Sequence, residues 1–298
     1  MKKFHFIVMV ITVSLASTQA LAQSDPEVVL KTIQVAESIY MLESAGSGNI
    51  GVSVGEDGFL IVDDKFAPLV EKIQKSLSKL GGGELKFILN THWHGDHTGG
   101  NEAFGRRATI IAHDNVRKRL STRQTIEFFD MVTEPHPKVA LPVITFDESL
   151  SVHFNGEEIK VIHFAQGHTD GDSVIFFTSS NVVHTGDHFF NGMYPFIDLD
   201  SGGNVQGFID NVAKLLTLIP QDAKIIPGHG PVGDINDLKS FHSMLVEVSG
   251  IVRRAIDQNK SLEEVQKDGF PEEIVEKWGK GFLTTEKWIG IVYRSYSK

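Results

Sequence analysis

The segment of the sequence with the clearest chemistry is residues 90–100, which follows a short apolar run at residues 87–89. Within six positions it carries four side chains that could bind a metal, namely His92, His94, Asp96 and His97. In an extended turn the first two histidines can point the same way, because side chains alternate. Gly95 would then let the backbone reverse, so that the later aspartate and histidine face them. Imidazole and carboxylate groups bind zinc and similar metals, so this segment predicts a metal site.

Three later segments place another histidine or aspartate beside a glycine, just after a predicted strand. The strands are residues 158–164, 182–184 and 224–226, and the side chains that follow them are His168, Asp187 and His229. Loops at strand ends converge in layered α/β proteins, and sites form there. We therefore expect these three residues to complete the metal site.

The order of these residues resembles the metallo-β-lactamase superfamily of zinc hydrolases. The resemblance rests on the motif His-x-His-x-Asp-His followed by a later His, Asp and His. It extends from the first predicted hairpin to the Gly-His-Gly loop around His229. It implies an α/β fold in which two β-sheets pack face to face with helices outside, an αββα sandwich.

The resemblance also implies two metal ions and assigns their ligands. The first ion would be bound by His92, His94 and His168. The second would be bound by Asp96, His97 and His229, and Asp187 would bridge both. The resemblance implies two Zn²⁺, with iron as the alternative because the same donors suit it. Asp63, at the end of a predicted strand, resembles an aspartate that steadies the motif loop; the alternative is a solvated turn residue.

Two adjacent cations can lower the pKa of a shared water towards ~7, and the resulting hydroxide can attack a carbonyl carbon. Asp96 is the expected catalytic residue, since its carboxylate can orient the water and move its proton. The best-known β-lactamases of the superfamily carry Cys where this chain has Asp187. We favour β-lactam hydrolysis, with a lactone, thioester or sulfate ester as the alternative substrate. A non-catalytic metal-binding protein is a further alternative, which the complete ligand set disfavours.

The first 22 residues have the pattern of a secretory signal peptide. Lys2 and Lys3 precede an apolar stretch at residues 4–15, and a small-residue site follows at residues 20–22. The pattern predicts a periplasmic or secreted protein, with no membrane attachment once the peptide is removed. The alternative is an uncleaved N-terminal anchor.

Composition narrows the function further. The 298 residues include 28 Lys and Arg, 38 Asp and Glu, and no Cys, giving a net charge of −10. A thiolate metal site and a cysteine nucleophile are therefore excluded. The acidic balance argues against a nucleic-acid partner, so we expect a small-molecule substrate. The oligomeric state is not predicted.

The elements that must position these side chains can also be predicted. Hydrophobic periodicity predicts a hairpin from strands 50–54 and 59–62, and helices at residues 65–80, 205–219 and 235–257. A strand at 173–177 and two C-terminal helical stretches, around Pro271 and Trp288, complete the pattern. We expect one domain at residues 23–298, with the insert 123–142 as a surface loop or a flap beside the site.

The remaining histidines and aromatic residues have structural interpretations. His113, His153, His163 and His184 are expected in the core or at strand ends, and His136 and His242 on the surface. His188 could support the site or touch substrate. Residues 189–196 form either a wall of the substrate site, with Tyr194 donating to an oxyanion, or part of the core. Trp93 and a C-terminal stripe of Trp278, Phe282, Trp288, Ile289 and Val292 are expected to pack internally.

Overall fold

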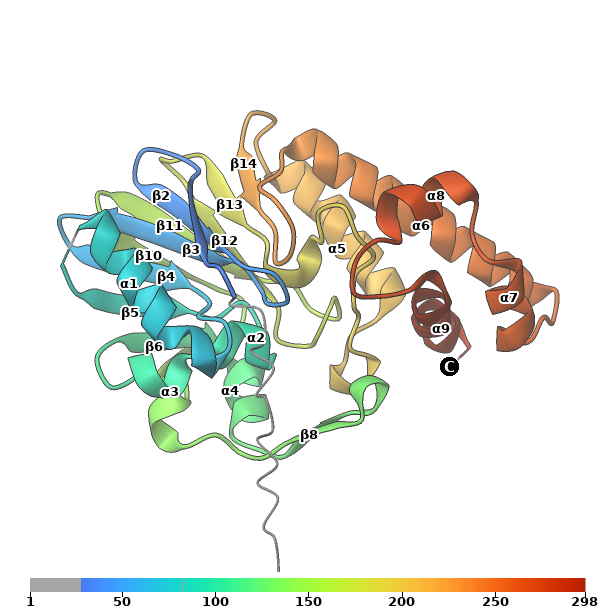
Figure 1. Cartoon of the computed structure of the whole chain (residues 1–298), viewed down its shortest axis with the longest axis horizontal. Coiled ribbons are helices and arrows are strands. Elements are labelled where there is room, and N and C mark those ends of the chain that lie inside the picture. The colour runs from blue at the N-terminus through green and yellow to red at the C-terminus, as the bar shows by residue number, and fades with distance from the viewer. Residues whose placement is uncertain (1–27, 82, 298) are drawn as a thin grey trace, which may run out of the picture.

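The computed structural model describes residues 28–81 and 83–297 and has four layers, with two β-sheets between outer layers of helices (Figure 1). This is the predicted αββα sandwich. The predicted signal peptide, residues 1–22, lies outside the described residues. Among the described residues, no helix combines the length and apolar character needed to cross a membrane.

The first sheet has seven strands in the order β1-β2-β3-β4-β5-β6-β9. Its strands are β1 Lys31–Gln34, β2 Ile39–Glu43, β3 Ile50–Gly55, β4 Gly58–Val62, β5 Leu85–Leu89, β6 Thr109–His113 and β9 Ile144–Phe146. The first four pair antiparallel, and β4, β5, β6 and β9 run parallel. The predicted hairpin is present as β3 and β4, joined at the pair Gly55 and Gly58.

The second sheet has five strands in the order β10-β11-β12-β13-β14. Its strands are β10 Ser149–Phe154, β11 Glu157–His163, β12 Ser173–Phe177, β13 Val182–His184 and β14 Lys224–Ile226. The pairs are antiparallel except the last, in which β13 and β14 run parallel. Strands β11, β13 and β14 therefore share one direction, and their carboxyl ends meet at one edge of the sheet.

Helices cover the outer faces of both sheets, and the one-turn helix at Gly95–Thr98 lies in the connection that follows β5. They are α1 Val70–Leu80, α2 Gly95–Thr98, α3 Asn101–Phe104, α4 Asp114–Leu120, α5 Val205–Leu218, α6 Ile235–Asp257, α7 Leu262–Asp268, α8 Glu272–Trp278 and α9 Thr285–Tyr296. The long helix α6 has the predicted bounds. Asp234 and Asp237 form a capping box at its first turn, which satisfies backbone N–H groups there.

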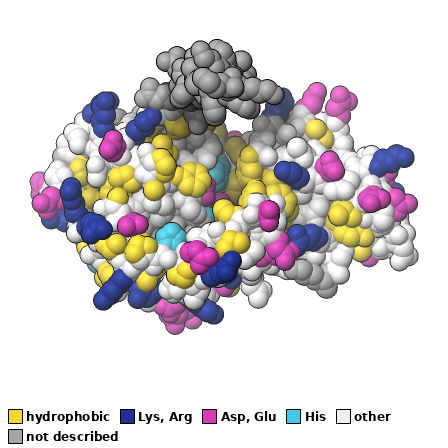
Figure 2. All heavy atoms as spheres, turned by 60° about the horizontal axis from the view of Figure 1, so that its bottom comes forward, with side chains coloured by type: hydrophobic (Ala, Val, Ile, Leu, Met, Phe, Trp, Pro, Cys, Tyr) yellow, Lys and Arg dark blue, Asp and Glu magenta, His cyan; other side chains and the backbone are white. Residues whose placement is uncertain are grey.

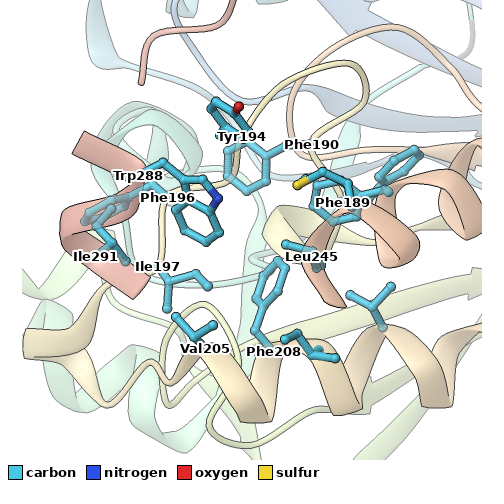
Figure 3. Packing of buried hydrophobic residues seen from close by; sticks show 14 of the residues in the cluster. Phe189, Phe190, Tyr194, Phe196, Ile197, Val205, Phe208, Leu245, Trp288 and Ile291 are labelled. Atoms are coloured by element: carbon cyan, nitrogen blue, oxygen red, sulfur yellow. The ribbon is translucent and has the colours of Figure 1, made fainter. Parts of the chain in front are cut away.

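Three apolar clusters hold the layers together. One lies between the sheets, where residues such as Leu60 and Val62 of the first sheet meet Val161 and Ile175 of the second. A second joins the outer face of the first sheet to α1. The third and largest joins the second sheet to α5, α6 and the C-terminal helices, and Figure 3 shows part of it. The middle cluster makes the fold a sandwich, because both sheets bury a face against it.

The helix predicted at residues 65–80 is too long at its start. A 3-10 turn occupies Ala67–Leu69, and α1 begins only at Val70. Lys65 has a left-handed backbone conformation, with φ of 60°, so it cannot belong to a regular helix. The helix ends as predicted, at Gly81 with φ of 79°.

Two other predicted segments differ from the structure. The C-terminal region contains three helices, α7, α8 and α9, rather than two stretches. The insert 123–142 contains a small hairpin of β7 Gln124–Ile126 and β8 Met131–Thr133. This hairpin lies along the lower edge of the molecule in Figure 1.

Candidate metal centre

The seven predicted ligands come together at the carboxyl ends of four strands. The motif segment follows β5, while His168 follows β11, Asp187 follows β13 and His229 follows β14. The turn that brings Asp96 and His97 back differs from the prediction, because it is the short helix α2 rather than a reversal at Gly95. Helical turning, not glycine's conformational freedom, therefore positions this part of the motif.

The side chains form two groups whose donor atoms converge, and Asp187 lies between them. The first group is His92, His94, His168 and Asp187, and the second is Asp96, His97 and His229. In the first group His94 Nδ1 lies 3.1 Å from His92 Nε2 and 2.9 Å from His168 Nε2. Asp187 Oδ2 lies 3.3 Å from His168 Nε2.

The second group has similar spacing. Asp96 Oδ2 lies 3.4 Å from Nε2 of both His97 and His229. Asp187 Oδ1 faces His97 Nε2 at 3.1 Å, while Oδ2 faces His229 Nε2 at 3.5 Å. The two oxygens of Asp187 thus reach donor atoms of both groups.

The donor atoms fit divalent metals. Tetrahedral zinc with bonds of about 2.0–2.1 Å places neighbouring ligand atoms about 3.3 Å apart, which is the spacing seen here. His97 Nε2 and Asp187 Oδ1 are buried and make no hydrogen bond. Buried polar atoms are normally paired, so two such atoms facing one another indicate a place for a cation.

The charge states of the buried groups suit the same role. Burial and the neighbouring His97 lower the pKa of His92 well below its usual range, and burial lowers the pKa of His168 to about 4. Burial opposes ionisation of Asp187, but the surrounding imidazoles, His97 first, outweigh it and hold its pKa well below normal. At neutral pH His92 and His168 therefore offer neutral imidazoles, and Asp187 offers an ionised carboxylate.

Asp63 supports the motif loop, as predicted. Its Oδ1 accepts from the Thr91 backbone N–H at 2.7 Å, and its Oδ2 lies 2.7 Å from His97 Nδ1. A carboxylate can only accept here, so Nδ1 carries a proton, and in the neutral ring Nε2 would keep its lone pair for a cation. Burial opposes protonation of His97, but Asp187, Asp96 and Asp63 outweigh it and raise its pKa well above its usual range, so a cation bound at Nε2 would displace a proton. Asp63 is fully buried and has a φ of 64°, an uncommon conformation for a residue other than glycine.

Three supporting residues were not predicted from the sequence. Asp198 Oδ2 lies 2.9 Å from His94 Nε2 and fixes that ring as Asp63 fixes His97. The Asn49 amide donates to the backbone oxygens of Pro227 and Gly230 at 3.0 and 2.8 Å, and so holds the loop of His229. The fully buried Lys65 donates to the Gly48 carbonyl oxygen, and the Gly48 N–H donates to Asp96 Oδ2 at 3.1 Å.

The comparisons with known proteins agree with this arrangement. The family model described as the metallo-beta-lactamase superfamily matches residues 45–229, more than half of the chain. The chain belongs to the metallo-β-lactamase superfamily. That superfamily contains metallo-hydrolases, and this chain has a His/Asp cluster that could bind metal.

Curated relatives are also similar to this chain. The hydroxyacylglutathione hydrolase of Nitrosococcus oceani is 26% identical to it over 197 residues. The match covers 65% of this chain and 65% of that relative, so the chain spans about two thirds of its length. A protein of Methanocaldococcus jannaschii named "Probable metallo-hydrolase" is 28% identical over 197 residues, covering 63% of this chain and 90% of the relative.

Solved structures confirm the superfamily fold. The DIM-1 metallo-β-lactamase has a TM-score of 0.60 at 21% identity, covering 74% of this chain and 99% of that chain. The sec-alkylsulfatase Pisa1 from Pseudomonas sp. has a TM-score of 0.66 at 14% identity, covering 90% of this chain and 50% of that chain. At these identities the likeness concerns the fold alone.

The histidines outside the motif mostly follow the predictions. His113 and His163 stack with ring centroids 3.6 Å apart, and each contacts a backbone oxygen. His184 is buried and contacts the Asn49 oxygen at 3.2 Å. His188 is also buried, stacks on Phe208 and lies 3.2 Å from the Asn211 amide nitrogen. His153 lies next to the last residue of β10, as predicted, but its side chain is exposed and not part of the core.

A cleft with a volume of about 1060 Å³ opens onto the candidate ligands His94, Asp96, Asp187 and His229. Figure 2 shows a central hollow flanked by apolar side chains, with histidine visible inside it. Residues 189–196 contribute both to this cleft and to the core. Phe190, Met193 and Phe196 line the cleft, whereas Phe189 and Tyr194 pack in the core.

Tyr194 stacks on Trp288 in the core, as Figure 3 shows, so its predicted role as an oxyanion donor was wrong. Trp93 is buried as predicted, although it also borders the cleft. The other corrections are Phe282, which is 51% exposed and lines the cleft, and His136, which also lines it. Several residues of the insert 123–142 line the cleft, which favours the interpretation of this insert as a flap over that of an ordinary surface loop.

Proposed function

We propose that this protein is an exported di-zinc hydrolase that opens cyclic amides or esters, with β-lactams as the favoured substrates. The position of Asp187 carries the proposal, since its two oxygens face donor atoms of both ligand groups. In this proposal His92, His94 and His168 would hold one ion, Asp96, His97 and His229 would hold the other, and Asp187 would offer an oxygen to each. Two bound cations would supply an acidified water and polarise the scissile carbonyl.

The protein's own residues provide the remaining chemistry. The Asp96 side chain is 20% exposed and borders the cleft, whereas that of Asp187 is 4% exposed. Burial opposes ionisation of Asp96, but His97 and His229 outweigh it and lower its pKa. Asp96 is therefore ionised at neutral pH and can accept a hydrogen bond from a water in the cleft, so we assign it the role of orienting the attacking water and passing its proton on.

A thioester is the second candidate substrate, because one curated relative is named hydroxyacylglutathione hydrolase. Lactones and sulfate esters remain alternatives on the same site. Export rests on the signal-like pattern of residues 1–22, and the acidic charge supports a small molecule rather than a nucleic acid as the partner.

Metal analysis joined to a hydrolysis screen tests the proposal. The purified protein should contain about two zinc ions per chain and lose activity on chelation. The screen should include a β-lactam, a lactone, a thioester and a sulfate ester. The His168→Gln variant should lose metal and activity, while the exposed His153→Gln should retain both.

If the fully metallated protein hydrolyses no β-lactam, the favoured substrate is wrong, but the proposal that the protein is a hydrolase still stands. Activity that survives complete metal removal would overturn the mechanism. If the protein instead contains two iron ions per chain, the proposed metal would be wrong, but the proposed ligands and reaction would stand.

A further inference from the structure

More than half of the exposed large hydrophobic side chains of the described residues surround one cleft. Eleven such side chains are exposed over the described residues, and six of them line the cleft at the candidate metal centre. These six are Val28, Val29, Phe66, Phe129, Met131 and Phe282. Soluble proteins rarely group exposed apolar side chains in this way unless the surface binds something.

The cleft has apolar walls from separate parts of the chain. The β7–β8 hairpin carries Phe129 and Met131, and the segment between α8 and α9 carries Phe282. Figure 2 shows apolar side chains on both sides of the hollow. The cleft volume of about 1060 Å³ lies at the upper end of the range for small-molecule sites.

The apolar surface continues from both walls to the candidate ligands. On the hairpin side, the Phe129 ring lies 4.8 Å from Phe196, whose ring lies 5.8 Å from that of His94. On the other side, the Phe282 ring lies 6.3 Å from that of His229. A molecule with its reacting group at the ligands would therefore lay its remaining part along aromatic side chains.

The cleft offers little to balance a negative charge on that remaining part. Among its described lining residues the lysines are Lys31 and Lys280. Lys31 already lies 3.7 Å from Glu43, and Lys280 is exposed, so that water screens its charge and an ion pair with it would be weak. Burying an unpaired carboxylate against apolar walls is costly, so a charged substituent would be disfavoured there.

We propose that the substrate carries a large, uncharged apolar substituent, an alkyl chain or an aryl group, which binds between the β7–β8 hairpin and Phe282. This inference rests on the proposed hydrolase function for the reacting group. The walls select the substituent, and Met131 and Phe282 determine specificity for its length.

A series of γ-lactones with alkyl substituents of two to eight carbons tests the proposal. Each buried CH₂ should raise kcat/KM about fourfold until the chain passes the rim of the cleft. A carboxylate at the end of the longest chain should lower kcat/KM at least about tenfold. A flat series, or no penalty for the carboxylate, would overturn the proposal.

Binding without reaction gives an independent measurement. N-phenyl-1-naphthylamine is uncharged, aromatic and has no hydrolysable bond, so its fluorescence should report binding in the cleft of the metal-loaded protein. 2-Alkylcyclopentanones should displace it, with affinity that rises along the same chain-length series. If no lactone is hydrolysed, the proposed function loses that substrate, and this displacement series alone decides the inference about the cleft.

Neighbouring side chains on β8 provide a matched control. Met131 lines the cleft, whereas Val132 is 48% exposed and is not among the lining residues. Met131→Ala and Phe282→Ala should each lower kcat/KM for the longest lactone about tenfold and leave the shortest unchanged. Val132→Ala should change neither value. Equal effects of the Met131 and Val132 variants would overturn the proposed walls.

Discussion

The supporting aspartates offer a sharp test of the metal centre, because each fixes one histidine from outside its ligand group. Asp63 Oδ2 lies 2.7 Å from His97 Nδ1, and Asp198 Oδ2 lies 2.9 Å from His94 Nε2. In each case the carboxylate requires a proton on the outer nitrogen, which leaves the inner nitrogen free to bind a cation.

Asp63→Asn replaces a carboxylate by an amide of the same shape. If the new NH₂ group faces His97 Nδ1, the ring must move its proton to Nε2 and lose the lone pair that faces Asp187. Loss of such a supporting contact typically lowers metal affinity 10–100-fold. The variant also loses a hydrogen bond to a charged group, so the free energy of unfolding of the metal-free protein should fall by about 2 kcal/mol.

The assay is a zinc titration by calorimetry or chelator competition. Wild type should bind two ions, and Asp63→Asn should weaken one binding step while the other stays tight. Asp198→Asn should weaken the other step, and the double variant should weaken both. Asp57→Asn is the control, since Asp57 is exposed and its carboxylate accepts from the Asn155 backbone N–H. Two unchanged zinc affinities in Asp63→Asn would refute the reasoning about the tautomer.

Three further predictions address the bridge, its surroundings and a buried charge. Asp187→Ala should lower metal content, because both ligand groups lose a shared oxygen; two retained ions would contradict bridging. Gly228→Ala should also lower metal content, measured by elemental analysis, since a Cβ would lie 2.0 Å from Asp187 Oδ1 and 2.8 Å from the Gly186 backbone. Gly95→Ala is its control, with the nearest atom outside its chain neighbours 3.8 Å away. Burial lowers the pKa of Lys65 to about 8. The unfolded chain therefore binds the extra proton between pH 8 and 10.5, and stability should rise across that window by up to about 3 kcal/mol relative to Lys65→Met. Denaturant titrations give the free energy of unfolding of both proteins at each pH. If the difference between the two proteins stays constant from pH 8 to 10.5, the shifted pKa is contradicted.

Much of the fold was predictable because local patterns encode it. Two apolar runs joined by a Gly-bounded polar turn predicted the β3–β4 hairpin, and the apolar pattern of residues 235–257 predicted the bounds of α6. The early start predicted for α1 failed for a physical reason. Lys65 fits the helical pattern as a surface residue, yet its side chain is buried and donates to the Gly48 carbonyl oxygen. These two residues are 17 positions apart in the sequence. No local pattern records such a contact.

The sequence by itself determined which residue types could bind metal and where they follow strands. The histidines and aspartates of the motif, with His168, Asp187 and His229, could be identified because ligand chemistry and strand-end positions are local properties. Only the tertiary structure decided how their atoms face one another and which side chains support them. Asp198 is 104 residues from His94, and nothing around it marks the contact. The cleft has the same origin, since the hairpin and Phe282 form its walls only after the two sheets and the C-terminal helices have packed. Long-range packing fixes these distances, and a pattern of neighbouring residues does not contain them.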